Sequence, residues 1–381
     1  VLFRSAYGTG NLGDDLLLKA ALQYHRSLDN DIDICIVAYG KVFLEETGLK
    51  IINHDNFVSS PEEFLSANSS VHFSGGGLFW AASHCDDMLK VARQQKSLGG
   101  EVHIERIGAQ GFHKNPESVK ELFSIADTNT VRDQMSAELL SRYGVYESAN
   151  PSCDYVLTLD TSSFTPKRLK RPTVAINHSA TIFYRDSEHR TKTLRIYKQL
   201  AQFFQGQVDF VYFPHARHFR CIDQNDIINA EQFWCFSGGL ISAIPFPETV
   251  EDALRTFSTF SGAIGWRYHL LVLAKLFRIP SAYLGQLGEH KYGAFAKENI
   301  LPMINFDLDE STIIQSCKNF INRDVLGMSA SAEPEVQNIG IKESASSLQH
   351  GEAYRSTLIE IQESMLRLRQ LVHSPPPNES S

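Results

Sequence analysis

The chain has 381 residues, which is enough for two domains of ordinary size. Hydrophobic residues make up 43% and charged residues 21%, an ordinary globular composition that can fill two apolar cores. The formal net charge of −8 argues against a protein that binds nucleic acid with its whole surface, and no run reaches the ~18–20 apolar residues that cross a bilayer.

Six cysteines are scattered along the chain, with no Cys-x-x-Cys pair and no His/Cys spacing of a zinc site. This usage predicts reduced thiols and a reducing compartment, so the cytoplasm is the expected location. The sequence starts at Val1 inside an apolar run, and a removed N-terminal signal or anchor therefore stays open as an alternative.

The first half of the chain alternates strand-like apolar runs with helical patterns. Strands are expected over 1–7, 32–37, 70–74, 102–108 and 128–131, and helices over 15–27, 85–98, 116–125 and 134–143. Repetition of strand, loop and helix, with glycine-rich loops after the first and third strands, predicts βα units on a parallel sheet. Residues 1–150 are therefore expected to form a first α/β domain.

Three prolines and a basic run interrupt this rhythm and predict a linker over 151–172. The rhythm then restarts, so residues 173–325 are expected to form a second α/β domain. Its expected strands are 173–178, 208–213, 260–264 and 281–284, and its expected helices are 190–205, 224–236, 248–257 and 269–277. Residues 326–381 are expected to form a mobile segment, a C-terminal helix and a tail. An apolar stripe from Tyr354 to Val372 suits packing on the first domain or on a second subunit, which permits a homodimer.

The loop from Gly8 to Asp14 joins the first strand to the first helix, at the sheet edge where ligands bind. Gly8, Gly10 and Gly13 match Gly-x-Gly-x-x-Gly, which keeps a nicotinamide or flavin enzyme open. Against that reading, a carboxylate at Asp14 would repel a pyrophosphate. A tight turn with Asp14 or Asp15 as helix cap is the plain structural alternative. Residues 75–77 form a second glycine loop at the same edge, and the pair suggests a shared cleft.

Positive groups are expected at the ends of other strands. Arg132 follows the strand 128–131 and can clamp a phosphate or carboxylate, unless it forms only a surface pair with Asp133. Arg267 and His269 open a helix, and Lys291 comes 22 residues after His269. Together these groups can converge on an anion.

Two histidines end another strand of the second half. His215 and His218 have a spacing that can hold a metal, but no acidic or cysteine ligand accompanies them, so no metal is expected. His215 is expected near the ligand, as a hydrogen-bonding or acid/base group.

Four motifs in order resemble the polysaccharide pyruvyltransferase family over about residues 2–300. They are Gly-Asn-x-Gly-Asp at 10–14, Gly-Gly-Gly at 75–77, Arg-Asp-x-x-Ser at 132–136, and Gly-x-Arg-x-His at 265–269 followed by Lys291. The resemblance implies a GT-B-like fold, with two Rossmann-like domains facing across a cleft. Trp266 and Tyr268 are bulkier than the residues often found inside the last motif, and the helix after residue 350 has no clear counterpart.

The resemblance also implies an activity in polysaccharide biosynthesis, such as that of an exopolysaccharide or another cell-surface glycan. Phosphoenolpyruvate would be the donor, a sugar or lipid-linked oligosaccharide the acceptor, and the products a pyruvate ketal and phosphate. No further cofactor is implied, and a lipid-linked acceptor would bring peripheral association with a membrane. Arg132, His269 and Lys291 match positions that hold the donor in the family.

The chemistry of this reaction assigns expected roles to the candidate residues. Asp14 is the candidate base, or stabiliser of positive charge at C2, and His269 is the candidate acid. The candidate substrate-binding residues are Gly10, Asn11, Gly13, Gly75, Gly76, Gly77, Arg132, His215, Arg267 and Lys291. A GT-B glycosyltransferase with a nucleotide-sugar donor and a non-catalytic carbohydrate-binding protein of the same fold remain alternatives.

Overall fold

The computed structural model describes residues 1–328, apart from 46–47, 79–81, 110–114, 146–150, 165–168, 179, 219–223 and 287–290. The expected mobile segment, C-terminal helix and tail lie outside the described residues. No helix among the described residues is long and apolar enough to cross a membrane.

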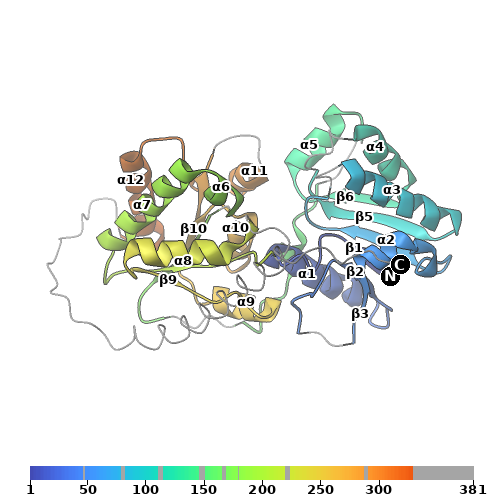
Figure 1. Cartoon of the computed structure of the whole chain (residues 1–381), viewed down its shortest axis with the longest axis horizontal. Coiled ribbons are helices and arrows are strands. Elements are labelled where there is room, and N and C mark those ends of the chain that lie inside the picture. The colour runs from blue at the N-terminus through green and yellow to red at the C-terminus, as the bar shows by residue number, and fades with distance from the viewer. Residues whose placement is uncertain are drawn as a thin grey trace, which may run out of the picture.

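The first domain is built on a sheet of six parallel strands in the order β3-β2-β1-β4-β5-β6 (Figure 1). The strands are β1 (Leu2–Arg4), β2 (Cys35–Ala38), β3 (Lys50–Asn53), β4 (Ser70–Ser74), β5 (Glu101–Ile107) and β6 (Thr128–Val131). The helices that connect them are α1 (Leu12–Leu28), α2 (His54–Ser59), α3 (Ala82–Ser97), α4 (Pro116–Ile125) and α5 (Gln134–Arg142). A 3₁₀ turn, η1, covers Pro61–Glu63.

The second domain repeats this plan, with parallel strands in the order β12-β11-β10-β7-β8-β9. The strands are β7 (Thr173–Asn177), β8 (Asp209–Tyr212), β9 (Ile241–Ala243), β10 (Gly262–Gly265), β11 (Ser281–Gly285) and β12 (Met303–Asn305). The helices are α6 (Ala180–Arg185), α7 (Ser187–Phe203), α8 (Asp226–Ser237), α9 (Val250–Phe257), α10 (Tyr268–Leu276), α11 (Lys291–Glu298) and α12 (Glu310–Phe320), followed by a π-helical turn, η5 (Ile321–Val325).

Both sheets have the doubly wound strand order of a dinucleotide-binding domain, so each has one point where the order reverses. In the first sheet this point lies between β1 and β4, and in the second it lies between β7 and β10. Ligands of open parallel sheets bind beyond the carboxyl ends of the strands at such points. The loops after β1, β4, β7 and β10 are therefore the places to look for a site.

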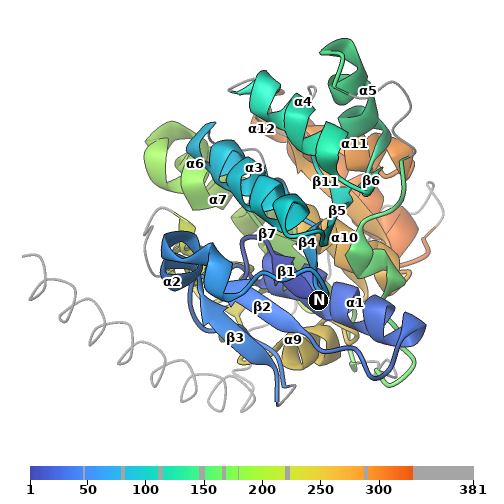
Figure 2. The same ribbon diagram turned by 90° about the vertical axis from the view of Figure 1, so that its right-hand side faces the viewer.

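Helix α1 lies where the two domains meet (Figures 1 and 2). It packs on β4 of its own sheet, on α9 of the second domain, and on a 3₁₀ turn of the connecting segment, η3 (Tyr155–Thr158). This position explains why α1 is buried on more than one face, including Leu16, Leu17 and Leu18 in succession. One continuous cluster of buried apolar side chains contains residues of both domains.

The long central elements agree with the expectation, whereas three strands and several helices were not expected. The strands β3, β9 and β12 have only three or four residues and lie at or near the edges of their sheets. Each of these three strands buries a single residue, so its sequence has no apolar run that indicates a buried strand. The helices α2, α6 and α12 were also not expected, and β1 ends at Arg4, earlier than the expected end at Tyr7.

Candidate active site

The glycine loop of the first domain contacts a loop of the second domain directly. The backbone nitrogen of Leu12 donates to the carbonyl of His215 over 2.8 Å, and that of Arg217 donates to the carbonyl of Gly10 over 2.7 Å. Gly10 has a φ of 87°, and a Cβ there would overlap the Arg217 carbonyl, so the contact requires glycine. The loop thereby places residues 10–14 against the second domain.

Asn11 caps α1 and also orients Asp14. Its side-chain oxygen accepts from the backbone nitrogen of Gly13 over 3.1 Å, and its amide nitrogen donates to Asp14 Oδ2 over 2.8 Å. The expectation that Asp14 or Asp15 caps this helix is therefore wrong. Asp15 instead accepts a hydrogen bond from the backbone nitrogen of Gly8, at the start of the same loop.

The carboxylate of Asp14 lies beside the second glycine loop, because a Cβ at Gly76 would be 3.7 Å from its Oδ1. Burial raises the pKa of Asp14 to about 6, although Lys291, the Asn11 amide and Arg132 each act to lower it. The side chain keeps part of its surface exposed. A half-buried carboxylate that titrates near neutrality suits a general base.

The second glycine loop follows β4 and is held against β5. Gly75 and Gly76 both have a φ of 68°, a conformation that favours glycine. The backbone nitrogen of Gly108 donates to the carbonyl of Gly76 over 2.7 Å. The hydroxyl of Ser5, buried and without a hydrogen-bond partner, would lie 3.6 Å from a Cβ at Gly76. Gly77 follows and is half-buried.

Arg132 follows β6 and is almost completely buried, with 4% of its surface exposed. Its Nε donates to Asp133 Oδ2 over 2.9 Å, its Nη1 lies 3.8 Å from Asp154 Oδ2, and its guanidinium carbon lies 4.4 Å from the centre of the Tyr268 ring. The pairing with Asp133 was one of the alternatives, but it is a buried contact and not a surface pair. Its Nη2 has no hydrogen-bond partner among the described residues, which leaves this nitrogen free to donate to a ligand.

His269 lies in the first turn of α10 and faces the start of α1. A Cβ at Gly13 would overlap the His269 imidazole, so glycine permits the approach of the two helix ends. Burial lowers the pKa of His269 well below its usual value, and the positive charges of Arg132 and Lys291 lower it further. The ring is therefore neutral at pH 7, and its buried Nε2 has no partner.

Arg267 precedes α10 and forms an ion pair with a residue that the sequence did not single out. Its Nη2 donates to Asp226 Oδ1 over 2.6 Å. The other carboxylate oxygen of Asp226 accepts from the backbone nitrogens of His215 and Ala216, at 2.8 and 3.1 Å. The fully buried Asp226 thus fixes both Arg267 and the loop that meets Gly10. Nε of Arg267 has no partner.

His215 follows β8 and is also buried, with 2% of its surface exposed. Its Nδ1 lies 3.0 Å from the amide nitrogen of Asn177 and 3.2 Å from the carbonyl of Phe213. Burial, reinforced by the charge of Arg267, lowers the pKa of His215 to about 3, so the ring is neutral. Asn177, the last residue of β7, also accepts from the backbone nitrogen of Arg267 and was missed by the sequence. His218 is half-buried.

The candidate residues of the two domains therefore meet at one place. Four groups act electrostatically on His269, and they are Arg132, Lys291, His215 and Arg267. Four nitrogen atoms of this cluster are buried and lack a hydrogen-bond partner among the described residues, and they are Arg132 Nη2, His215 Nε2, Arg267 Nε and His269 Nε2. Lys291 begins α11 and is half-buried. Because buried polar groups are normally satisfied, such a group of open nitrogens, with a guanidinium donor from each of two arginines, is typical of a site for an acceptor-rich ligand.

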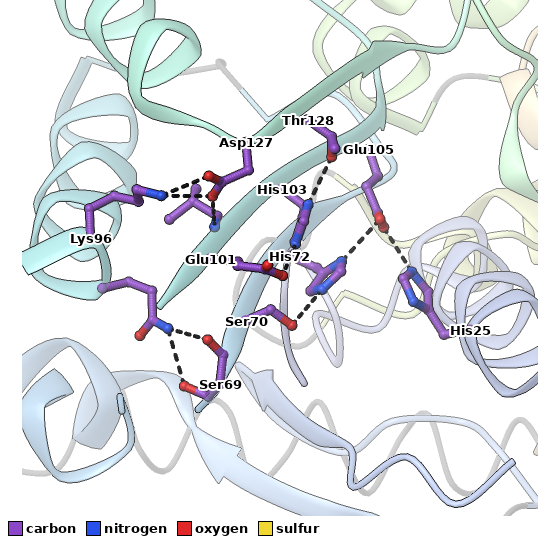
Figure 3. A network of polar contacts seen from close by, with 12 residues as sticks. His25, Ser69, Ser70, His72, Lys96, Glu101, His103, Glu105, Asp127 and Thr128 are labelled. Carbon is purple, nitrogen blue, oxygen red and sulfur yellow. Dashed lines mark hydrogen bonds and ion pairs between the residues drawn. The ribbon is translucent and has the colours of Figure 1, made fainter. Parts of the chain in front are cut away.

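Metal ligands do not gather in this cluster. Among the described residues, the group with the geometry for a metal ion is His25, His72 and Glu105. It lies on the sheet of the first domain, near the far end of α1 (Figure 3).

Solved structures of other proteins share this fold. A UDP-GlcNAc 2-epimerase from Methanocaldococcus jannaschii has a TM-score of 0.56 at 11% identity, over 85% of this chain and 92% of that chain. The S. aureus protein MnaA, solved with UDP, has a TM-score of 0.54 at 13% identity, over 84% and 87%. These likenesses establish a GT-B fold of two α/β domains. At such low identity they do not extend to activity.

Sequence comparison identifies the family. No curated protein sequence matches the chain significantly. The family model described as polysaccharide pyruvyl transferase matches residues 11–286, which include the candidate residues from Asn11 to His269. The chain belongs to the polysaccharide pyruvyl transferase family.

Proposed function

We propose that the protein transfers the pyruvyl group of phosphoenolpyruvate to two hydroxyls of one sugar, which forms a ketal and releases phosphate. The observation that carries the proposal is the group of four buried nitrogen atoms without partners, drawn from both domains. Phosphoenolpyruvate carries a phosphate and a carboxylate on a small skeleton. It therefore needs several donors and positive charges at one point.

The positive side chains of the cluster are suited to hold these two anionic groups. Arg132 has Nη2 open and Arg267 has Nε open, while Asp133 and Asp226 hold the other side of each guanidinium. Each arginine is thereby oriented before a ligand arrives, which lowers the cost of binding. Lys291 adds a third positive charge.

The reaction joins two hydroxyl oxygens of the sugar to C2 of the donor. Protonation of the methylene carbon produces positive charge at C2, and one sugar hydroxyl adds there. The second hydroxyl then replaces the phosphate, so the C2–oxygen bond to phosphate breaks. Of the two hydroxyl protons, one balances the new methyl group and the other leaves with phosphate. A negative side chain near C2 stabilises the charge that develops.

Asp14 and His269 are the groups that we assign to proton transfer. Asp14 is ionised above pH 6 and can accept a hydroxyl proton. His269 is neutral in the free protein because burial and neighbouring positive charges lower its pKa. A bound dianion offsets these charges and raises the pKa, so that His269 gains a proton in the complex and can deliver it.

The test is incubation of the protein with phosphoenolpyruvate and a panel of simple glycosides. The expected result is phosphate release that depends on one sugar, with a product that has gained one pyruvylidene group by mass spectrometry. Arg132→Lys, which keeps the charge but loses the forked donor, is expected to lower kcat/KM by about 100-fold. The matched control Arg93→Lys, at an exposed arginine paired with Glu121, should leave turnover unchanged. Binding of a nucleotide sugar in place of phosphoenolpyruvate would contradict the proposal.

A further inference from the structure

A second cluster of polar side chains lies on the face of the first sheet that α1 covers (Figure 3). His72 of β4 and His103 of β5 are neighbours in the sheet register, with ring centroids 4.4 Å apart. Glu105 lies two residues beyond His103 and so on the same face. His25, in the last turn of α1, reaches Glu105 from above the sheet.

Three of these residues point their ligand atoms toward one another. His25 Nε2 lies 3.0 Å from Glu105 Oε2, and His72 Nδ1 lies 3.0 Å from Glu105 Oε1. One ligand atom from each residue can be chosen so that all three lie within 4.8 Å of one another. In a tetrahedral zinc site the ligand atoms are about 3.3 Å apart. Each histidine lies within a few tenths of an ångström of that value from one oxygen of Glu105, His25 from Oε2 and His72 from Oε1.

The carboxylate of Glu105 is largely buried, with 14% of its side-chain surface exposed. Among the described residues, its ion-pair partners are His25 and His72. Buried charges are normally paired or bound to metal ions, and one carboxylate between two imidazoles is a ligand set that suits a cation.

We propose that His25, His72 and Glu105 bind a divalent transition-metal ion, with zinc as the ion that best suits two imidazoles and a carboxylate. The ligand nitrogens, Nε2 of His25 and Nδ1 of His72, are then unprotonated, and each ring carries its proton on the other nitrogen. For His72 that nitrogen lies 2.8 Å from Ser70 Oγ, the kind of outer contact that orients a metal-bound histidine.

The position of the cluster suits an ion with a structural role. The hydroxyl of Tyr155 donates to Glu105 Oε2 over 3.0 Å and so lies at the edge of the three ligand residues. The ion would join the end of α1 to β4 and β5. Since α1 begins at the glycine loop of the candidate active site, the ion would stabilise the helix that carries Asp14 without contacting the substrate.

The experiment is calorimetric titration of zinc chloride into the full chain after treatment with a chelator and dialysis. We expect one zinc ion per chain with micromolar or tighter affinity, a higher Tm with zinc, and tetrahedral absorption bands when cobalt replaces zinc. His72→Gln and Glu105→Gln should each weaken binding by about 100-fold or more. His103→Gln, beside the site but outside the ligand set, is the matched control and should keep it.

The same measurements can overturn the proposal. Absence of stoichiometric binding to the wild type, or equal affinity in His72→Gln and Glu105→Gln, would show that the cluster is not a metal site. If His72→Gln lowers the Tm while the wild type binds no zinc, the cluster is a hydrogen-bond network alone and the proposal is wrong. The wild-type titration does not depend on the folding of any variant or on the proposed reaction.

Discussion

Asn11 performs two tasks with one side chain. Its oxygen caps α1 through the backbone nitrogen of Gly13, and its amide nitrogen holds Asp14. The second contact lowers the pKa of Asp14 against the larger effect of burial. Helix stability and the titration of the proposed base therefore depend on the same residue.

Asn11→Ala is expected to lose a helix cap, at a cost of about 1 kcal/mol, and to raise the pKa of Asp14. The low-pH limb of kcat/KM should then move to higher pH. Asn225→Ala, which removes the corresponding cap of α8, is the matched control. It should cost a similar free energy of unfolding and leave the pH profile in place. An unchanged pH profile of kcat/KM in Asn11→Ala would show that Asp14 is not the base.

Asp14→Asn is expected to abolish turnover and to stabilise the protein at neutral pH. The pKa of Asp14 is raised from 3.8 to about 6, so the folded state holds this proton more tightly than the unfolded state. Stability is lost as pH rises from about 4 to about 6 and stays lower above that range. The variant should therefore gain up to about 3 kcal/mol at pH 7.5, and the gain should shrink toward pH 4. Urea unfolding at several pH values measures it, and an equal gain at all pH values would contradict the assignment.

At the scale of elements, the segment that joins the domains is held to the first domain at two adjacent residues, Asp154 and Tyr155. Tyr155 donates to Glu105 over 3.0 Å, and its ring lies 4.4 Å from the guanidinium carbon of Arg106. Arg106 has a φ of 49° at an irregularity of β5, which lets consecutive residues of the strand both reach Tyr155. The neighbouring Asp154 approaches Arg132. This stretch, residues 154–158, thus connects the buried cluster of Glu105 to the proposed donor site.

Tyr155→Phe removes one donor from Glu105 and keeps the aromatic ring. We expect a loss of about 1–3 kcal/mol in the free energy of unfolding, because an ionised and largely buried carboxylate loses a hydrogen bond. Tyr24→Phe, at an exposed tyrosine beside the same arginine, is the control and should change stability by less than about 0.5 kcal/mol. If both substitutions change the free energy of unfolding equally, the hydrogen bond from Tyr155 to Glu105 does not contribute to stability.

The elements also show what the sequence could and could not predict. Buried strands such as β4 and β7 appear as apolar runs and helices such as α4 as amphipathic patterns, and the expected ranges match them closely. The edge strands β3, β9 and β12 do not, because each buries a single residue and carries no apolar run. The expected site residues followed from position, since Arg132, His215 and Lys291 come directly after or near the ends of strands.

Other parts of the site had no signal in the sequence. Asn177 ends a strand without a glycine loop, and Asp226 looks like an ordinary acidic residue in the first turn of a helix. Their roles appear only when the loops after β7, β8 and β10 come together. His25, His72 and Glu105 are equally far apart in sequence, and the strand register and the packing of α1 bring them into contact.

At the scale of the whole molecule, the two sheets have the same strand order, and the loop after β1 contacts the loop after β8 and the start of α10. The domains also share one buried apolar cluster and an ion pair between Lys19 of α1 and Glu251 of α9. Much of the apolar surface between them is therefore removed from water in the folded state.

Because of this shared core, the chain is expected to unfold in one cooperative thermal transition instead of two. Phosphoenolpyruvate, which would bind groups of both domains, should raise the Tm, and at 100 times Kd it adds about 2.7 kcal/mol of stability. Differential scanning calorimetry with and without the ligand measures both effects. Two separate transitions, of which the ligand shifts neither, would contradict a site shared by the domains.

The fate of the oxygen that links C2 of phosphoenolpyruvate to phosphorus tests the central claim most directly. Ketal formation breaks the bond between C2 and this oxygen, so a heavy-oxygen label at that position should leave entirely with phosphate, and only when an acceptor sugar is present. Mass spectrometry of the phosphate and of the modified sugar measures the result. Label that stays with pyruvate, or phosphate that is released equally without a sugar, would contradict the transfer of a pyruvyl group.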